Sequence, residues 1–102
     1  MQLTAQEIDL DLLVFVERYV TNLVRWDVLT LFGEQPDAAK SAEAIAQQVK
    51  RNYKIVWPEL GDLVLLGVLD RRICGEQTLY QLADDKSMRV QVVRFAAQHF
   101  QH

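Results

Sequence analysis

The side chains best suited to acid–base or metal chemistry are few and scattered in this chain of 102 residues. His99 and His102 have a spacing that can bind a metal, but two ligands do not complete a zinc site, and Cys74 is expected on a distant hairpin. Asp84 and Asp85 are explained by the N-terminus of a helix, which stabilises carboxylates without any substrate. The sequence contains no glycine-rich phosphate loop, nucleophile elbow or HExxH motif. We therefore expect no metal, no cofactor and no enzymatic activity.

A second group of reactive side chains is basic and clustered. Lys50, Arg51 and Lys54 fall within residues 44–58, a stretch that contains no acidic side chain. The formal net charge of the chain is −3, and residues 1–40 hold three basic and seven acidic side chains, so the positive charge lies away from the N-terminus. This balance argues against a protein that binds phosphates over its whole surface, but it permits one basic region.

Composition predicts one soluble globular domain. Half of the residues are apolar and a quarter are charged, and the length suits a single core. Residues 1–11 lack the basic start and apolar run of a secretory signal. The longest apolar stretch, residues 63–69, is far shorter than the roughly 20 residues that span a bilayer, so we expect no membrane segment. The single cysteine, Cys74, excludes an internal disulfide and favours a cytoplasmic location.

Hydrophobic periodicity predicts two helices in the first third of the chain. Thr4 opens a capping box, and apolar residues at three- and four-residue spacing predict a helix over 5–20. The apolar pattern continues over 22–32, where Asn22 is a suitable N-cap. Gly33 is expected to close this second helix in the left-handed conformation.

The remaining elements are two further helices, a hairpin and a last helix. Ser41 is a good N-cap for a short third helix. The fourth helical period ends near Gly67, where the chain must turn sharply into a strand and only glycine reaches positive φ without a steric cost. Over 68–83 the period changes to two, which predicts a small hairpin. Asp84 or Asp85 can cap a final helix that is apolar on two faces and so needs two packing partners.

The segment 41–69 resembles the helix-turn-helix of winged-helix regulators of the MarR and ArsR type, and the hairpin resembles their wing. The positions that carry the resemblance are Ile45, Ala46, Leu60, Leu63, Gly67, Val68 and Leu69. The resemblance implies a mainly α (α+β) winged helix-turn-helix fold with about five helices and one small β-hairpin wing. It divides the single domain, residues 1–102, into N-terminal helices (1–33), the helix-turn-helix (41–69), the wing (70–83) and a C-terminal helix (84–102).

In this family the second motif helix lies in the major groove of DNA and the wing touches the flanking backbone. The resemblance therefore implies a DNA-binding transcriptional regulator. Carried over by position, its candidate contacts are Lys50, Arg51, Asn52, Tyr53, Lys54, Trp57, Arg71 and Arg72. The cations would meet phosphates, whereas Asn52 is as able to cap a helix as to pair with adenine. Spare apolar faces on the N-terminal helices and the last helix predict a homodimer.

Departures from the family pattern keep a second interpretation open. Pro58 falls inside the second motif helix and is expected to shorten or kink it. Val56 and Trp57 place apolar bulk where regulators often have small polar residues, although we expect Trp57 to be partly buried by packing. Glu59 and Asp62 follow closely. The alternative function is a winged-helix adapter that binds a protein partner through Val56 and Trp57 and does not bind DNA.

Overall fold

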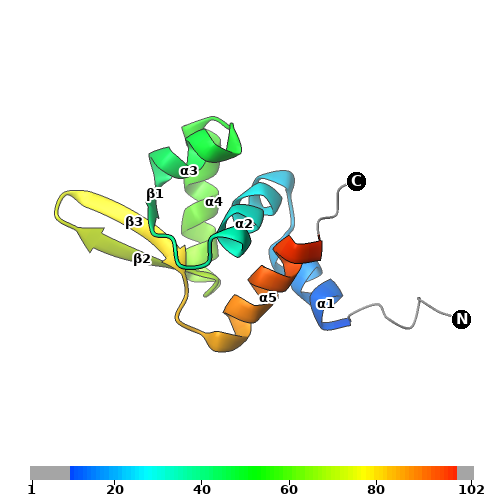
Figure 1. Ribbon diagram of the computed structural model, residues 1–102. Helices are drawn as coiled ribbons and strands as arrows, with labels where there is room; N and C mark the ends of the chain where they lie inside the picture. Colours follow the sequence, from blue (N-terminus) through cyan, green and yellow to red (C-terminus); the bar gives the residue numbers. More distant parts are fainter. Residues whose placement is uncertain (1–9, 99–102) are drawn as a thin grey trace, which may run out of the picture.

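The computed structural model describes residues 10–98, which form five helices and three strands. In chain order they are α1 (Leu10–Tyr19), α2 (Leu23–Glu34), β1 (Lys40–Ser41), α3 (Ala42–Val49), α4 (Tyr53–Leu65), β2 (Leu69–Cys74), β3 (Gln77–Leu82) and α5 (Lys86–Gln98), as Figure 1 shows. The expected capping box at Thr4 and the two histidines, His99 and His102, lie outside the described residues. None of the helices within 10–98 is long and apolar enough to cross a membrane.

Side-chain caps fix the starts of three helices. Asn22, Ser41 and Asp85 each accept the backbone N–H three residues later, at 2.9, 3.1 and 3.0 Å. Each of these caps satisfies an N–H that has no partner within its own helix. The predicted caps of α2, α3 and α5 are therefore confirmed.

Two predictions about helix ends have opposite outcomes. Gly67 has a φ of +82° and leads from α4 into β2, as expected. The prediction that Gly33 closes α2 in the left-handed conformation is wrong, because α2 continues through it to Glu34. The physical reason for a glycine there is packing: a Cβ at position 33 would lie 2.4 Å from the Cβ of Ala96 on α5.

The expected shortening of the second motif helix is also wrong. Pro58 lies in the second turn of α4, and the helix nevertheless runs for 13 residues. Proline removes one backbone hydrogen bond. The helix tolerates this loss because Val56, Leu60 and Leu63 anchor its other face and are completely buried.

The sheet closes one end of the molecule. Its order is β1-β3-β2, all antiparallel, with Leu69 opposite Leu82 in the hairpin. The two-residue strand β1 was not predicted, because a strand so short carries no periodic signal. Ile45 and Leu69, two of the positions that carry the family resemblance, are completely buried beside the buried face of α4 and form the core between the helix-turn-helix and the hairpin.

A second layer of packing joins α1, α2 and α5. The ring of Phe95 lies 5.1 Å from that of Trp26 and 6.1 Å from that of Phe15. In Figure 1, α2 lies between the α3–α4 pair and α5, while the hairpin extends away from the helices. The helix-turn-helix and the α1–α5 pair therefore pack against different sides of α2.

Candidate nucleic-acid interface

The turn between α3 and α4 places a cation in an unusual backbone conformation. Lys50 has a φ of 60° and ψ of 45°, and its N–H and that of Arg51 return to carbonyls in the last turn of α3. This hydrogen-bonding pattern usually has glycine at the left-handed position, because a side chain there costs roughly 1–2 kcal/mol. The turn thereby presents the exposed Lys50 side chain at the start of the α4 face.

Arg51 and Asn52 already have partners inside the protein. The Arg51 Nε lies 2.6 Å from the Asp27 carboxylate on α2, and this ion pair is about one-third exposed. Asn52 is the N-cap of α4, where its side-chain oxygen accepts the Lys54 N–H at 2.7 Å. Of the two roles considered for Asn52, the structure therefore shows capping. Neither side chain is as available to DNA as the sequence suggested.

The exposed face of α4 carries Tyr53, Lys54 and Trp57. Trp57 is 53% exposed, so packing covers just under half of its surface and leaves the rest open to a partner. Val56 is completely buried in the core and cannot contact any partner. The apolar pair proposed as a protein-docking surface therefore reduces to Trp57 alone, because adjacent helical residues point in directions about 100° apart.

The wing contributes its two arginines on opposite faces of β2, because successive strand residues alternate. The Arg71 guanidinium carbon lies 6.0 Å from the centre of the Tyr80 ring, within reach of a cation–π contact. Arg72 donates to the Gln81 side chain at 3.0 Å. The turn residues Gly75 and Glu76 bring no positive charge to the tip.

A groove of about 680 Å³ separates α4 from the wing. Its walls include Tyr53 and Trp57 from α4 and Arg71, Ile73 and Tyr80 from the sheet. Three aromatic side chains thus line the groove, and its charged residues are Arg71, Glu43 and Glu76. Of the candidate residues, Tyr53, Trp57 and Arg71 are brought together here, whereas Lys54 and Arg72 do not line the groove.

The two acidic residues of α4 share one basic partner, which sequence analysis did not select. Arg25 on α2 donates to Glu59 at 2.7 Å and to Asp62 at 3.3 Å, and its side chain is only 12% exposed. Because both carboxylates share this one arginine, one of their two negative charges is compensated at the α4 surface. No local signal identifies Arg25, since its partners lie far along the chain.

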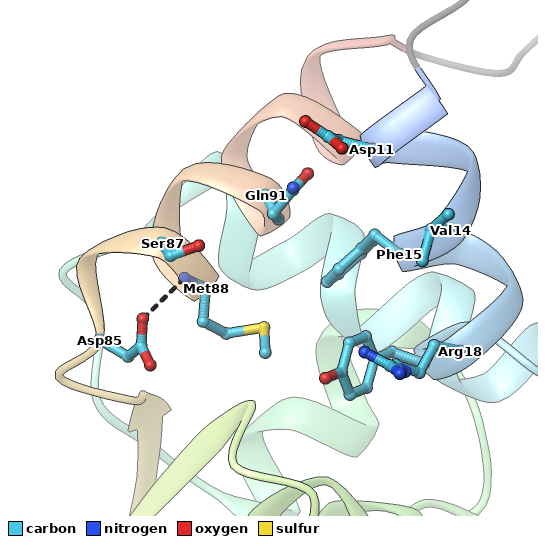
Figure 2. Close-up of a pocket in the computed structure, with 9 residues that line it drawn as sticks. Asp11, Val14, Phe15, Arg18, Asp85, Ser87, Met88 and Gln91 are labelled. Atoms are coloured by element: carbon cyan, nitrogen blue, oxygen red, sulfur yellow. Dashed lines mark hydrogen bonds between the residues drawn. The ribbon is translucent and has the colours of Figure 1, made fainter.

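The opposite end of the molecule has a shallow pocket of about 260 Å³ between α1 and α5. Figure 2 shows side chains that line it, among them Asp11, Phe15 and Arg18 from α1 and Ser87, Met88 and Gln91 from α5. The Gln91 Oε1 atom is buried and has no hydrogen-bond partner among the described residues. Such an atom costs free energy unless another group supplies a donor.

Metal-binding side chains do not gather within residues 10–98. No group of three or more His, Cys, Asp or Glu residues there could hold an ion. Cys74 is an exposed free thiol at the end of β2.

Comparison with known proteins identifies the fold. No protein-family model matches the sequence, and the search of curated proteins finds no relative. Among solved structures, one match is the homodimeric winged helix-turn-helix DNA-binding domain of Mb0332 from Mycobacterium bovis, a possible ArsR-family transcriptional regulator. Its TM-score is 0.64 and its sequence identity 22%, and the match covers 99% of this chain and 96% of that one. HlyU from Vibrio cholerae matches with a TM-score of 0.71 and 15% identity over 93% and 99%. The transcriptional repressor BigR from Xylella fastidiosa matches with a TM-score of 0.66 and 20% identity over 96% and 97%. These likenesses show that the chain has the winged helix-turn-helix fold.

Proposed function

We propose that this winged helix-turn-helix chain is a transcriptional regulator that binds double-stranded DNA as a homodimer, with α4 in the major groove. The observation that carries the proposal is that two lysine side chains near α4 are exposed and unpaired among the described residues. Lys50 and Lys54 are exposed and form no ion pair within residues 10–98, and both stand at the N-terminal end of α4. The positive end of the helix dipole adds to their attraction for phosphate.

The surroundings of these lysines favour an anionic partner. The acids that follow on α4, Glu59 and Asp62, are held by Arg25. Arg71 stands across the groove and would meet the sugar-phosphate strand that passes between the helix and the wing. Mb0332, a possible regulator, and BigR, a repressor, share the fold, which supports binding rather than catalysis as the activity.

The homodimer is proposed from an exposed apolar surface. Leu10, Leu13 and Val14 on α1 and Val90 and Val93 on α5 are all exposed. A second protomer that covers this α1–α5 surface would remove apolar area from water, and it could also supply a donor to the buried oxygen of Gln91. The Mb0332 domain is homodimeric by its description, which supports the same assembly here.

The DNA-binding test removes charge without disturbing the fold. Lys50→Gly suits the left-handed backbone at position 50, and Lys54→Ala replaces an exposed helical residue. We expect this double variant to bind a duplex of roughly 30 base pairs at least about tenfold more weakly at about 50 mM salt. The salt slope, which is the slope of the logarithm of the binding constant against the logarithm of the salt concentration, should be smaller by about one for each phosphate that the protein no longer neutralises. Fluorescence anisotropy at about 50 and about 200 mM salt measures both quantities.

Two controls make the result specific. Lys86→Ala removes one exposed lysine at the start of α5, far from α4 in sequence, and should leave affinity unchanged. Arg51 is left intact because its replacement would also break the ion pair with Asp27. Wild-type protein that binds no duplex in a salt-dependent way would reject the proposal and favour the adapter, which would then depend on Trp57. We also infer action in the cytoplasm, a reducing compartment that suits the exposed thiol of Cys74.

A further inference from the structure

The first half of α4 is poor in side chains that read bases by hydrogen bonds. Residues 53–61 include no Arg, Asn, Gln, Ser or Thr, and Lys54 is the one side chain there of the types that usually donate to guanine. Glu59, the one acidic side chain in this segment, is paired with Arg25. The Asn52 oxygen just before the segment is engaged in capping the helix. This segment therefore lacks the Asn or Gln that pairs with adenine, and only Lys54 could donate to guanine.

Two large apolar side chains near the start of α4 are exposed. Ile55 and Trp57 each have just over half of their surface accessible, at 54% and 53%. Because residues two apart in a helix point about 200° apart, these two side chains lie on opposite flanks of α4. The residues next to Trp57 on the helix surface have small side chains. Pro58 has a compact ring, and Gly61, one turn further on the same face, has nothing within 4 Å of the position of a Cβ. The indole ring of Trp57 is therefore the largest projection from this part of the helix.

The major groove presents one apolar feature at the base edges, the 5-methyl group of thymine. We infer that the protein selects DNA by apolar contact between Trp57 and thymine methyl groups. This inference rests on the proposed function, because it requires α4 to lie in the major groove. Lys50 and Lys54 would supply attraction to any duplex, and Trp57 would supply the preference among duplexes.

The test compares two duplexes that differ only in those methyl groups. Both are alternating A·T sequences of roughly 30 base pairs, and in the second every thymine is replaced by uracil. We expect the dissociation constant of the wild-type protein to rise about fivefold or more on the uracil duplex, as for one or two methyl groups removed from an apolar environment. Anisotropy titrations at about 50 mM salt give both constants.

Variants on the same helix assign the preference to a residue. Trp57→Ala should bind the two duplexes equally while it keeps the salt slope of the wild type, because its charge is unchanged. The matched control is Leu65→Ala, an apolar residue that is 84% exposed at the far end of α4, and it should keep the full preference. Both side chains are exposed, so neither change opens the core, and circular dichroism verifies folding.

The outcomes separate this inference from the proposed function. Equal affinity of the wild type for both duplexes, with salt dependence intact, would overturn the thymine preference and leave DNA binding in place. A preference that persists in Trp57→Ala would overturn its assignment to the indole ring, since shape or another residue would then carry it. Salt-independent or absent binding to both duplexes would reject the proposed function itself, and with it this inference.

Discussion

At the scale of single residues, the two helical glycines have opposite surroundings. Gly33 faces α5 so closely that a Cβ would lie 2.4 Å from the Ala96 Cβ and 2.6 Å from the Val92 carbonyl oxygen. Gly61 on α4 has nothing within 4 Å of the same position. The first glycine is required by packing, whereas the second only weakens its helix.

We predict changes of opposite sign when the two glycines become alanine. Gly33→Ala should lower the free energy of unfolding by about 1–3 kcal/mol, because α2 and α5 must separate to admit the methyl group. Gly61→Ala should raise it by about 0.5–1 kcal/mol through higher helix propensity. Chemical denaturation monitored by circular dichroism measures both. A Gly33→Ala protein as stable as wild type would show that close packing is not the reason for this glycine.

The glycines also show which residue roles can be predicted from the sequence. The role of Gly67 is local, because a helix must turn into a strand there, and its positive φ was predicted correctly. The role of Gly33 depends on Ala96, a residue in a different element, and no local pattern reveals it. The pairing of Arg51 with Asp27 was missed for the same reason. Candidate cations could be found from the sequence, but their availability to a ligand could not.

At the scale of elements, Arg25 joins α2 to α4. Its guanidinium contacts Glu59 and Asp62 and lies 3.5 Å from the Tyr19 carbonyl oxygen. Because Arg25 is only 12% exposed, its charge-assisted hydrogen bonds are better shielded than those of an ordinary surface pair. The same contacts hold α4 in position and compensate one of its two negative charges.

We predict that Arg25→Met lowers stability by about 1.5–3 kcal/mol, the range for hydrogen bonds to charged groups. It should also weaken DNA binding beyond the effect of unfolding, because two carboxylates on α4 lose their counter-charge. Denaturation and anisotropy measure the two effects, and adding Glu59→Gln should recover part of the affinity. Arg89→Met is the matched control: its partner Asp37 is 95% exposed, so we expect a loss of at most about 1 kcal/mol. Equal losses in the two variants would contradict a special role for Arg25.

Helices were more predictable than strands. Caps and apolar periodicity locate α2, α3 and α5, because each cap acts on a backbone N–H three residues away. The effect of Pro58 was overestimated, since tertiary packing of Leu60 and Leu63 holds α4 together around it. Strand β1 depends on pairing with β3 across the fold, with Lys40 opposite Tyr80, and its own two residues do not indicate it.

At the scale of the whole molecule, the α1–α5 surface and the α4 surface are separate parts of one small fold. The first surface exposes apolar side chains of α1 and α5, and the second exposes two lysines at the N-terminal end of α4. Assembly through the first surface would present two copies of the second, as two-fold DNA sites require.

We predict that Leu13→Glu combined with Val93→Glu gives a monomer, because charges placed in the α1–α5 interface would be desolvated on association. Light scattering after gel filtration measures the mass. The monomer should bind a duplex at least about tenfold more weakly than wild type, since two linked sites act together. Leu65→Glu, a charge on an equally apolar but unrelated exposed residue, should leave the mass unchanged. A wild-type protein that is already monomeric at micromolar concentration would refute the assembly.

The aromatic packing in the fold has a consequence for how a pair of these chains would use its two reading helices. Ring contacts run from Phe15 to Phe95 and on to Trp26, and the preceding residue, Arg25, binds α4. These packed and charged contacts connect α4 to α1 and α5, the helices that would lie at the two-fold axis of the proposed dimer, and would oppose a tilt of α4 relative to them. The distance between the two copies of α4 in the dimer would then be fixed, so the protein would select DNA by the spacing between two half-sites as well as by their base sequence.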